Sequence, residues 1–193
     1  MRFCLLALAT LAFARLTSAA PIDLGTSAAF TPYDPYLTPV KRVLSSVGGD
    51  KASMDRVTEL MRTGRSFRYV HSTPYLPAEP LQTATRRAGD CKDKALWLCD
   101  QLRDRSARFV IGQIKRNPRV SHAWVMWENE GRWWILDCTL SWRPIPADRV
   151  RRDDYVPLYS YSKNASYRHA RSAMLIARNS GTTTAVAATG TRR

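Results

Sequence analysis

Apolar residues recur at the spacing of one helical face in three stretches of the chain. The first begins with Thr38-Pro39, a pair typical of a helix start, and is closed by Gly48-Gly49. The second has Gly64 as its predicted stop. The third follows Asp90, whose carboxylate can accept a hydrogen bond from a free N–H of the first turn. We therefore predict helices over residues 38–47, 51–62 and 91–102.

Runs of β-branched and aromatic residues predict the strands. They cover residues 66–70 and 108–114, and a further run at 155–161 is predicted as an edge strand because it carries Pro157. Between the first two strands, residues 74–80 hold three prolines. We expect this segment to be a stiff surface loop that walls one side of the cleft faced by the third helix.

Residues 121–127 and 132–138 form a predicted hairpin, since both are dense in Trp, Val and Ile and the separator 128–131 is turn-like. A loop of two residues (129–130) or of four (128–131) places His122 directly opposite Asp137, with Cβ atoms about 4.5–5.5 Å apart. A carboxylate beside an imidazole on an apolar sheet face is costly unless the two groups satisfy each other. We therefore expect Asp137 to orient the imidazole and His122 to act as a base.

The two ends of the chain differ from its middle. Residues 1–20 combine Arg2, an apolar run and small residues before Pro21, which is typical of a signal peptide. Residues 21–37 lack periodicity and are predicted as an extended arm, and residues 170–193 as a disordered tail. We predict one domain over residues 38–169, in a periplasmic or secreted protein with no membrane span.

The chain is strongly basic, with 30 Lys and Arg against 16 Asp and Glu and a formal net charge of +14. Such a balance favours weak contact with anionic surfaces of the cell envelope. An Arg-rich composition that serves only solubility explains it equally well. No aromatic-and-basic motif for specific nucleic-acid binding is present.

Three cysteines remain after the predicted leader: Cys91, Cys99 and Cys138. An odd number in an oxidising compartment leaves one thiol to explain. A Cys99–Cys138 disulfide and three free thiols are both open from the sequence. The spacings do not match a zinc site, and we predict no bound metal or cofactor.

Cys91 stands in the first turn of the third predicted helix. There the positive end of the helix dipole and the unpaired N–H groups favour a thiolate. In chain order, Cys91, His122 and Asp137 supply a nucleophile, a base and a group that orients the base.

Three sequence blocks that carry these residues resemble the transglutaminase-like superfamily. They are residues 83–93 with Gly-Asp-Cys, 121–124 with His-Ala-Trp, and 134–139 with Asp-x-Thr, and they match in order and spacing. Tyr167 and the run at 155–161 are similar to bacterial transglutaminase-like cysteine peptidases. The resemblance implies an α+β, papain-like fold in which the Cys helix packs on an antiparallel sheet.

The resemblance also implies a function. Cys91 would attack a peptide or side-chain amide, His122 would shuttle the proton, and Asp137 would orient His122, giving hydrolysis through a thioester; an amine acceptor in place of water stays open. The backbone N–H of Cys91 would hold the oxyanion with an upstream donor that the sequence does not assign. Calcium-dependent members carry acidic residues on both sides of the cysteine, so Lys92 argues against calcium dependence here.

Two other interpretations compete with the peptidase. The first is a noncatalytic envelope-binding or scaffold module of the same fold that uses its basic surface. The second is a structural secreted protein with a disulfide through Cys91. Trp124 is expected in the core or beside the cleft, and His71 and His169 are expected at the surface.

Overall fold

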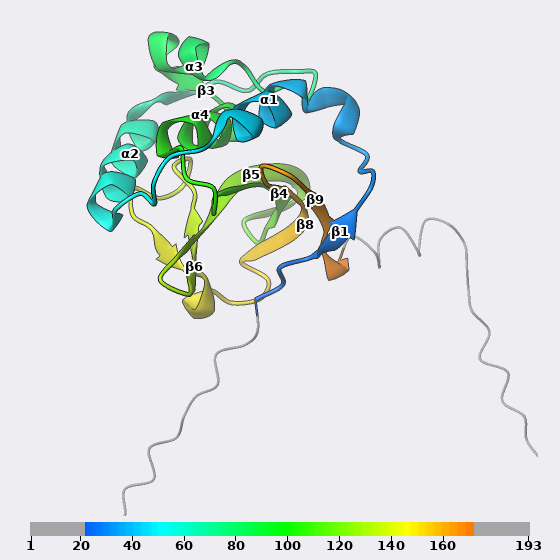
Figure 1. Ribbon diagram of the computed structural model, residues 1–193. Coiled ribbons are helices and arrows are strands. Elements are labelled where there is room, and N and C mark those ends of the chain that lie inside the picture. Colours follow the sequence, from blue (N-terminus) through cyan, green and yellow to red (C-terminus); the bar gives the residue numbers. More distant parts are fainter. Residues whose placement is uncertain (1–21, 172–193) are drawn as a thin grey trace, which may run out of the picture.

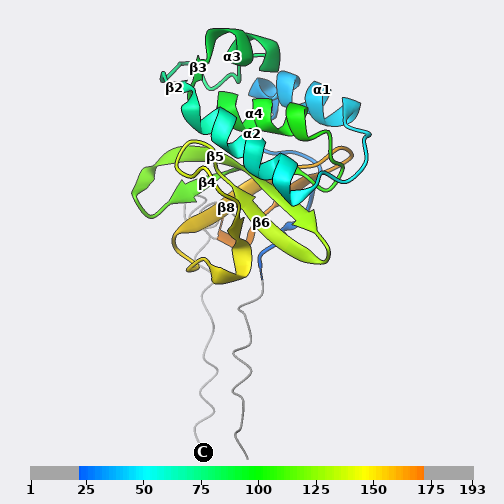
Figure 2. The same ribbon diagram turned by 90° about the vertical axis from the view of Figure 1, so that its left-hand side faces the viewer.

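A layer of helices covers one face of an antiparallel sheet in the computed structural model (Figures 1 and 2), which describes residues 22–171. The predicted leader (1–20) and all but two residues of the predicted tail (170–193) lie outside the described residues. Within that described part, no helix is both long and apolar enough to cross a membrane. The helices are α1 (Thr38–Ser46), α2 (Met54–Ser66), α3 (Pro80–Arg86) and α4 (Cys91–Leu102), with short 3₁₀ turns η1 (Asp34–Tyr36) and η2 (Ala147–Arg149).

The main sheet has seven strands in the order β1-β9-β8-β4-β5-β6-β7, and all neighbours are antiparallel. A small parallel pair, β2-β3, lies beside the helices. Together with the helical layer this is the α+β architecture that the sequence predicts. The strands are β1 (Thr26–Ala28), β2 (Arg68–Tyr69), β3 (Ala88–Gly89), β4 (Arg108–Ile114), β5 (Asn117–Asn129), β6 (Arg132–Leu136), β7 (Ile145–Pro146), β8 (Tyr155–Tyr161) and β9 (Ser166–Arg168).

Helices α1 and α4 match their predicted ranges, whereas α2 does not. It continues through Gly64, so the predicted stop at that glycine is wrong. A Cβ on Gly64 would lie 2.8 Å from Cys138 Sγ and 2.9 Å from Trp97 Cζ3. Glycine is present at this position because the helix packs closely there. Helix α3, which begins at Pro80, was not predicted.

Strand β8 is internal and lies between β9 and β4, so its prediction as an edge strand is wrong. Its Pro157 pairs with Gly112 where the β4–β8 register shifts. A bulge tolerates a residue that cannot donate to the ladder. The proline therefore marks an irregularity of an inner strand.

The β5–β6 hairpin is shifted by two residues from the predicted register. Asn129 pairs with Arg132, and the turn consists of Glu130 and Gly131, whose φ angles are 52° and 76°. A tight hairpin turn of this kind needs positive φ at both positions, and glycine provides it at the second. The predicted direct pairing of His122 with Asp137 is therefore wrong. A two-residue shift nevertheless keeps every side chain on its face of the sheet.

Residues 21–37 are not the extended arm that we predicted. Strand β1 pairs with β9 and adds an edge to the sheet. Thr31 and Leu37 are fully buried, and the Thr31 hydroxyl is hydrogen-bonded to that of Tyr161. The packed domain thus begins well before residue 38.

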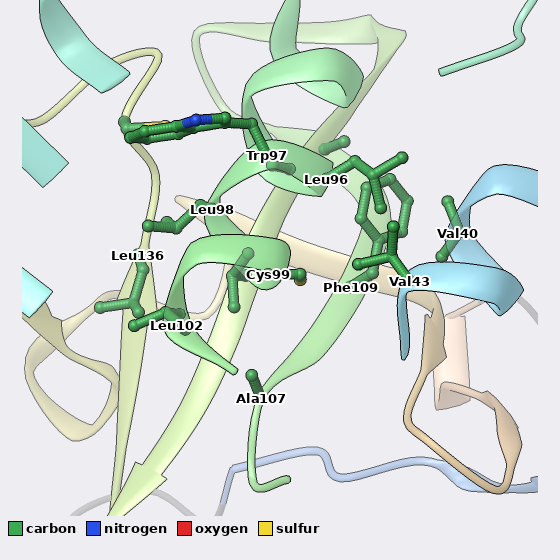
Figure 3. Close-up of a cluster of buried hydrophobic side chains, with 14 of the residues drawn as sticks. Val40, Val43, Leu96, Trp97, Leu98, Cys99, Leu102, Ala107, Phe109 and Leu136 are labelled. Atoms are coloured by element: carbon green, nitrogen blue, oxygen red, sulfur yellow. The ribbon is translucent and has the colours of Figure 1, made fainter. Parts of the chain in front are cut away.

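The main core lies between α4 and the sheet. Figure 3 shows Leu96, Leu98, Cys99 and Leu102 of α4 among residues of α1, β4 and β6. A smaller apolar cluster occupies the opposite face of the sheet and is formed by Val110, Trp124, Met126 and Ile135. The sheet therefore has apolar side chains on both faces.

Gly64→Val tests the contact between α2 and α4. The added side chain overpacks Cys138 and Trp97, and we expect a loss of about 1–3 kcal/mol in the free energy of unfolding. Gly48→Val is the matched control, because a Cβ at Gly48 meets no atom closer than 3.9 Å. Urea unfolding measures both. Equal stability of the two variants would contradict the close packing at Gly64.

Candidate active site

The N-terminus of α4 begins at Cys91 and is capped as the sequence predicts. Asp90 accepts a hydrogen bond from the Lys92 N–H at 3.1 Å, and Asp93 Oδ2 accepts one from the Asp90 N–H at 3.0 Å, which completes a capping box. A Cβ on Gly89 would lie 2.7 Å from Asp93 Cβ, so glycine permits this close turn. The Cys91 N–H is the first of the helix and has no acceptor within it.

The polar residues of this first turn are buried together with the apolar ones. Lys92 is 2% exposed, and its ammonium donates to Asp90 Oδ2, to the Ser72 hydroxyl at 2.9 Å and to the Ser72 carbonyl at 3.1 Å. Asp93 Oδ1 accepts the Ala78 N–H at 2.8 Å. Burial raises the pKa of Asp93, and the backbone N–H bonds oppose that rise. Each buried charge thus has partners, as burial requires.

Lys94, one turn into the helix, is also buried and donates to the Phe67 carbonyl at 2.6 Å. Burial lowers the pKa of this lysine. The bond connects α4 with the residue that precedes β2, and β2 carries Tyr69. Lys94 therefore helps to place the segment that faces Cys91.

His122 and Asp137 meet although the strands are not paired as predicted. His122 Nε2 lies 2.8 Å from Asp137 Oδ2, and both side chains are buried. Asp137 follows the last residue of β6, where the chain turns. Its Oδ1 accepts the N–H groups of Thr139 and Leu140 at 3.0 and 3.3 Å. The carboxylate is thereby fixed from both sides.

Tyr155 is a further partner of this pair that the sequence did not identify. Its hydroxyl donates to Asp137 Oδ2 at 2.9 Å, and its ring lies 5.3 Å from that of Trp124. The Trp124 indole in turn stacks on the His122 imidazole, with centroids 6.1 Å apart. Gly112 pairs with His122, and a Cβ there would lie 2.5 Å from the Trp124 ring. Only the folded strand order reveals this packing behind His122.

The surroundings of His122 favour the imidazolium. Burial lowers its pKa, but hydrogen bonds to Asp137 and Cys91 and the charges of both partners outweigh burial and raise the pKa to about 10. Both ring nitrogens of a protonated imidazole are donors, so Asp137 and Cys91 can each accept one hydrogen bond from it.

Cys91 and His122 both line one cleft of about 420 Å³. Tyr69 lines it as well, and its pKa is raised to about 12 by burial and then by the negative charges of Cys91, Asp90 and Asp93. A hydrogen bond to Cys91 contributes to this rise, so the phenol remains a donor. Residues 74–80 do not line this cleft, so the prediction that they form one of its walls is wrong. They contact the N-terminus of α4 instead, through the bond from Ala78 to Asp93. The rest of the lining is Ile114, Arg116, Asn117, Val120, Ser121, Thr139 and Leu140.

The three cysteines that the structure describes are free thiols. This arrangement is one of the two that the sequence left open, and it gives no support to a disulfide through Cys91. Cys99 and Cys138 are deeply buried, and burial raises the pKa of both, to about 12 for Cys138. Cys91 is the thiol that faces the cleft.

The remaining predicted positions divide between surface and core. His71 is exposed, as expected, with its Nδ1 3.8 Å from Asp90 Oδ2. The prediction of a surface position for His169 is wrong, because it is 1% exposed and bonds to Ser160 Oγ at 2.9 Å. Trp124 belongs to the core cluster on the far face of the sheet.

Comparison with known proteins supports the fold. No protein-family model matches the chain, and a search of the curated proteins finds no match. Among solved structures, the chain is similar to EGTA-treated LapG of Legionella pneumophila, with 18% identity, a TM-score of 0.53, and coverage of 68% of this chain and 74% of that one. It is also similar to calcium-bound LapG from the same organism, with 17% identity, a TM-score of 0.51, and coverage of 66% and 74%. The predicted transglutaminase-like, papain-like α+β fold is confirmed.

Asp137→Asn tests the electrostatics of the pair. Burial alone lowers the His122 pKa, so removal of the carboxylate charge should bring that pKa down from about 10. NMR titration of the imidazole measures the change. Asp148→Asn is the control, since Asp148 is an exposed carboxylate paired with Arg132. An unchanged His122 pKa in Asp137→Asn would contradict the assigned partner.

Proposed function

We propose that this protein is an exported thiol hydrolase, a cysteine peptidase or amidase that uses Cys91, His122 and Asp137. One observation carries the proposal: the first residue of a buried helix is a cysteine, and it shares a cleft with a histidine that is hydrogen-bonded to a buried carboxylate. These are the three roles that covalent acyl transfer requires. The fold likeness is in accord with it.

The reaction proceeds in two steps, acylation of Cys91 and hydrolysis of the resulting thioester. The Cys91 thiolate attacks the carbonyl carbon of an amide, and the C=O π electrons move to oxygen. His122 gives its proton to the leaving nitrogen, the C–N bond breaks, and an amine and a thioester result. Water then attacks the thioester while neutral His122 takes its proton. Collapse of the second tetrahedral intermediate releases the acid and restores the thiolate–imidazolium pair.

The oxyanion needs two donors, and we assign them to the Cys91 N–H and the Tyr69 hydroxyl. The N–H is unpaired in the helix, and the phenol keeps its proton because its pKa is about 12. Tyr69 lies upstream of Cys91, where the sequence left the second donor unassigned. Donors placed in advance around a developing oxyanion are a major source of rate enhancement.

The substrate is a protein or peptide, as the fold implies. Arg116 in the cleft adds a positive charge to its lining. The periplasm or the secreted fraction is the proposed location because of the predicted leader. The net charge of +14 supports weak contact with anionic envelope surfaces.

Calcium does not fit the residues beside Cys91. The carboxylate oxygens of Asp90 are occupied by the Lys92 ammonium and by backbone and hydroxyl donors of Ser72 and Lys92. An ammonium within bonding distance of Asp90 repels a second cation. We therefore assign no step to a metal.

The test of the proposed function is the appearance of new peptide termini. The purified chain is incubated with a proteome-derived peptide mixture, and mass spectrometry identifies the termini formed. We expect cleavage or side-chain deamidation with the unaltered chain and neither with Cys91→Ala. Cys99→Ala is the matched control and should retain activity.

If the chain forms no new termini although its Cys91 thiol is intact, that result would contradict the proposed hydrolase activity and favour the noncatalytic scaffold. A primary amine added to the same mixture distinguishes hydrolysis, in which water is the acyl acceptor, from transamidation, in which the amine is. Incorporation of the amine at the acyl group would show transamidation.

Tyr69→Phe tests the second oxyanion donor. Removal of one such donor costs about 10²–10³ in kcat, and we expect that loss with little change in KM. Tyr36→Phe, which alters an exposed tyrosine away from the cleft, should have no effect. A Tyr69→Phe variant with unchanged kcat would remove Tyr69 from the mechanism.

Chelation tests the exclusion of calcium. Because Lys92 occupies the carboxylate of Asp90, EDTA and added calcium should both leave the cleavage rate unchanged. Loss of activity in EDTA with recovery on calcium addition would contradict this.

A further inference from the structure

A second cavity lies on the face of the sheet away from the helices. Its volume is about 450 Å³, which is within the range of small-molecule sites. We call it the back cavity. Its floor is the smaller apolar cluster, with Trp124, Met126 and Ile135, and Tyr155 forms part of its wall. None of the residues proposed for catalysis lines it.

The rim of the back cavity is cationic. Arg151, Arg152 and Arg171 line it, all are exposed, and none of them forms a salt bridge with another described residue. Two carboxylates also lie on the rim. Asp148 is paired with Arg132 in two contacts of 2.8 and 3.0 Å, whereas Asp23 accepts the neutral N–H groups of Gly25 and Ala170 and keeps its negative charge. Three arginines against that one carboxylate leave the rim with a net positive charge.

We propose that the back cavity binds a free medium-chain fatty acid. Its acyl chain would cover the apolar floor, and its carboxylate would pair with the rim arginines. Guanidinium–carboxylate pairs are strong and directional, which fits a head group of this kind. An apolar body with one anionic end complements both parts of the cavity.

Two residues that line the back cavity contact the candidate active site. Tyr155 donates to Asp137, and Trp124 stacks on His122. An occupant would contact both side chains from behind. The binding claim itself does not depend on the proposed function, and its test uses no activity.

Calorimetric titration of the full chain with decanoate below its micelle concentration tests the site. We expect saturable binding, at least about tenfold weaker for decanol, which has the same chain without the charge. Arg151→Glu with Arg152→Glu should weaken decanoate binding by a similar factor. Arg62→Glu with Arg86→Glu changes the net charge equally on the helical side and should not. Ala147→Trp fills the cavity and should abolish binding.

Four results would overturn the proposal. Equal binding of decanoate and decanol would mean an unspecific apolar surface. Binding only to anionic phospholipid vesicles would assign the arginines to a membrane surface. Ala170 and Arg171 line the cavity, so decanoate binding only to a variant that ends at Arg171 would identify the chain's own tail as the occupant. Folded Ala147→Trp protein that binds normally would place the ligand elsewhere.

Discussion

The candidate active site depends on a helix terminus that is buried with its charges satisfied. Asp90 and Asp93 cap the first turn of α4, and the Lys92 ammonium neutralises Asp90 and holds Ser72. An unpaired charge at this depth would cost several kcal/mol. Because these residues flank Cys91 on both sides, the bonds that stabilise the helix start also fix the direction of the thiol.

The sheet supplies the other half of the site. His122 comes from β5, and Asp137 from the turn that follows β6, so their contact requires the hairpin to be closed. Asp137 takes four donors, from His122, Tyr155, Thr139 and Leu140. A carboxylate held this firmly can stabilise an imidazolium without moving, and such preorganisation is what electrostatic catalysis requires.

The sequence was most informative where one local rule decided the structure. Helix α4 and its cap could be predicted from Asp90 and from the helical spacing of the apolar residues that follow it. That His122 and Asp137 lie on the same face of the sheet could be predicted because successive side chains of a strand alternate between its two faces. The exact pairing failed because Glu130 adopts positive φ, which composition does not reveal. Pro157 and Gly64 were misread because a bulge and a close helix contact exist only in the folded chain. Tyr155 and Tyr69 join the site through long-range packing, for which the sequence holds no local signal.

The pH dependence of Cys91 alkylation by iodoacetamide tests whether Cys91 and His122 form a thiolate–imidazolium pair. If they do, labelling should already be rapid below about pH 6, and His122→Ala should lose that acidic reactivity. Cys99 and Cys138 should stay unlabelled in the folded chain, because they are 0% and 2% exposed and neither lines the cleft, whereas Cys91 does. Labelling that begins only above about pH 8 and is unchanged in His122→Ala would show an ordinary thiol and contradict the account.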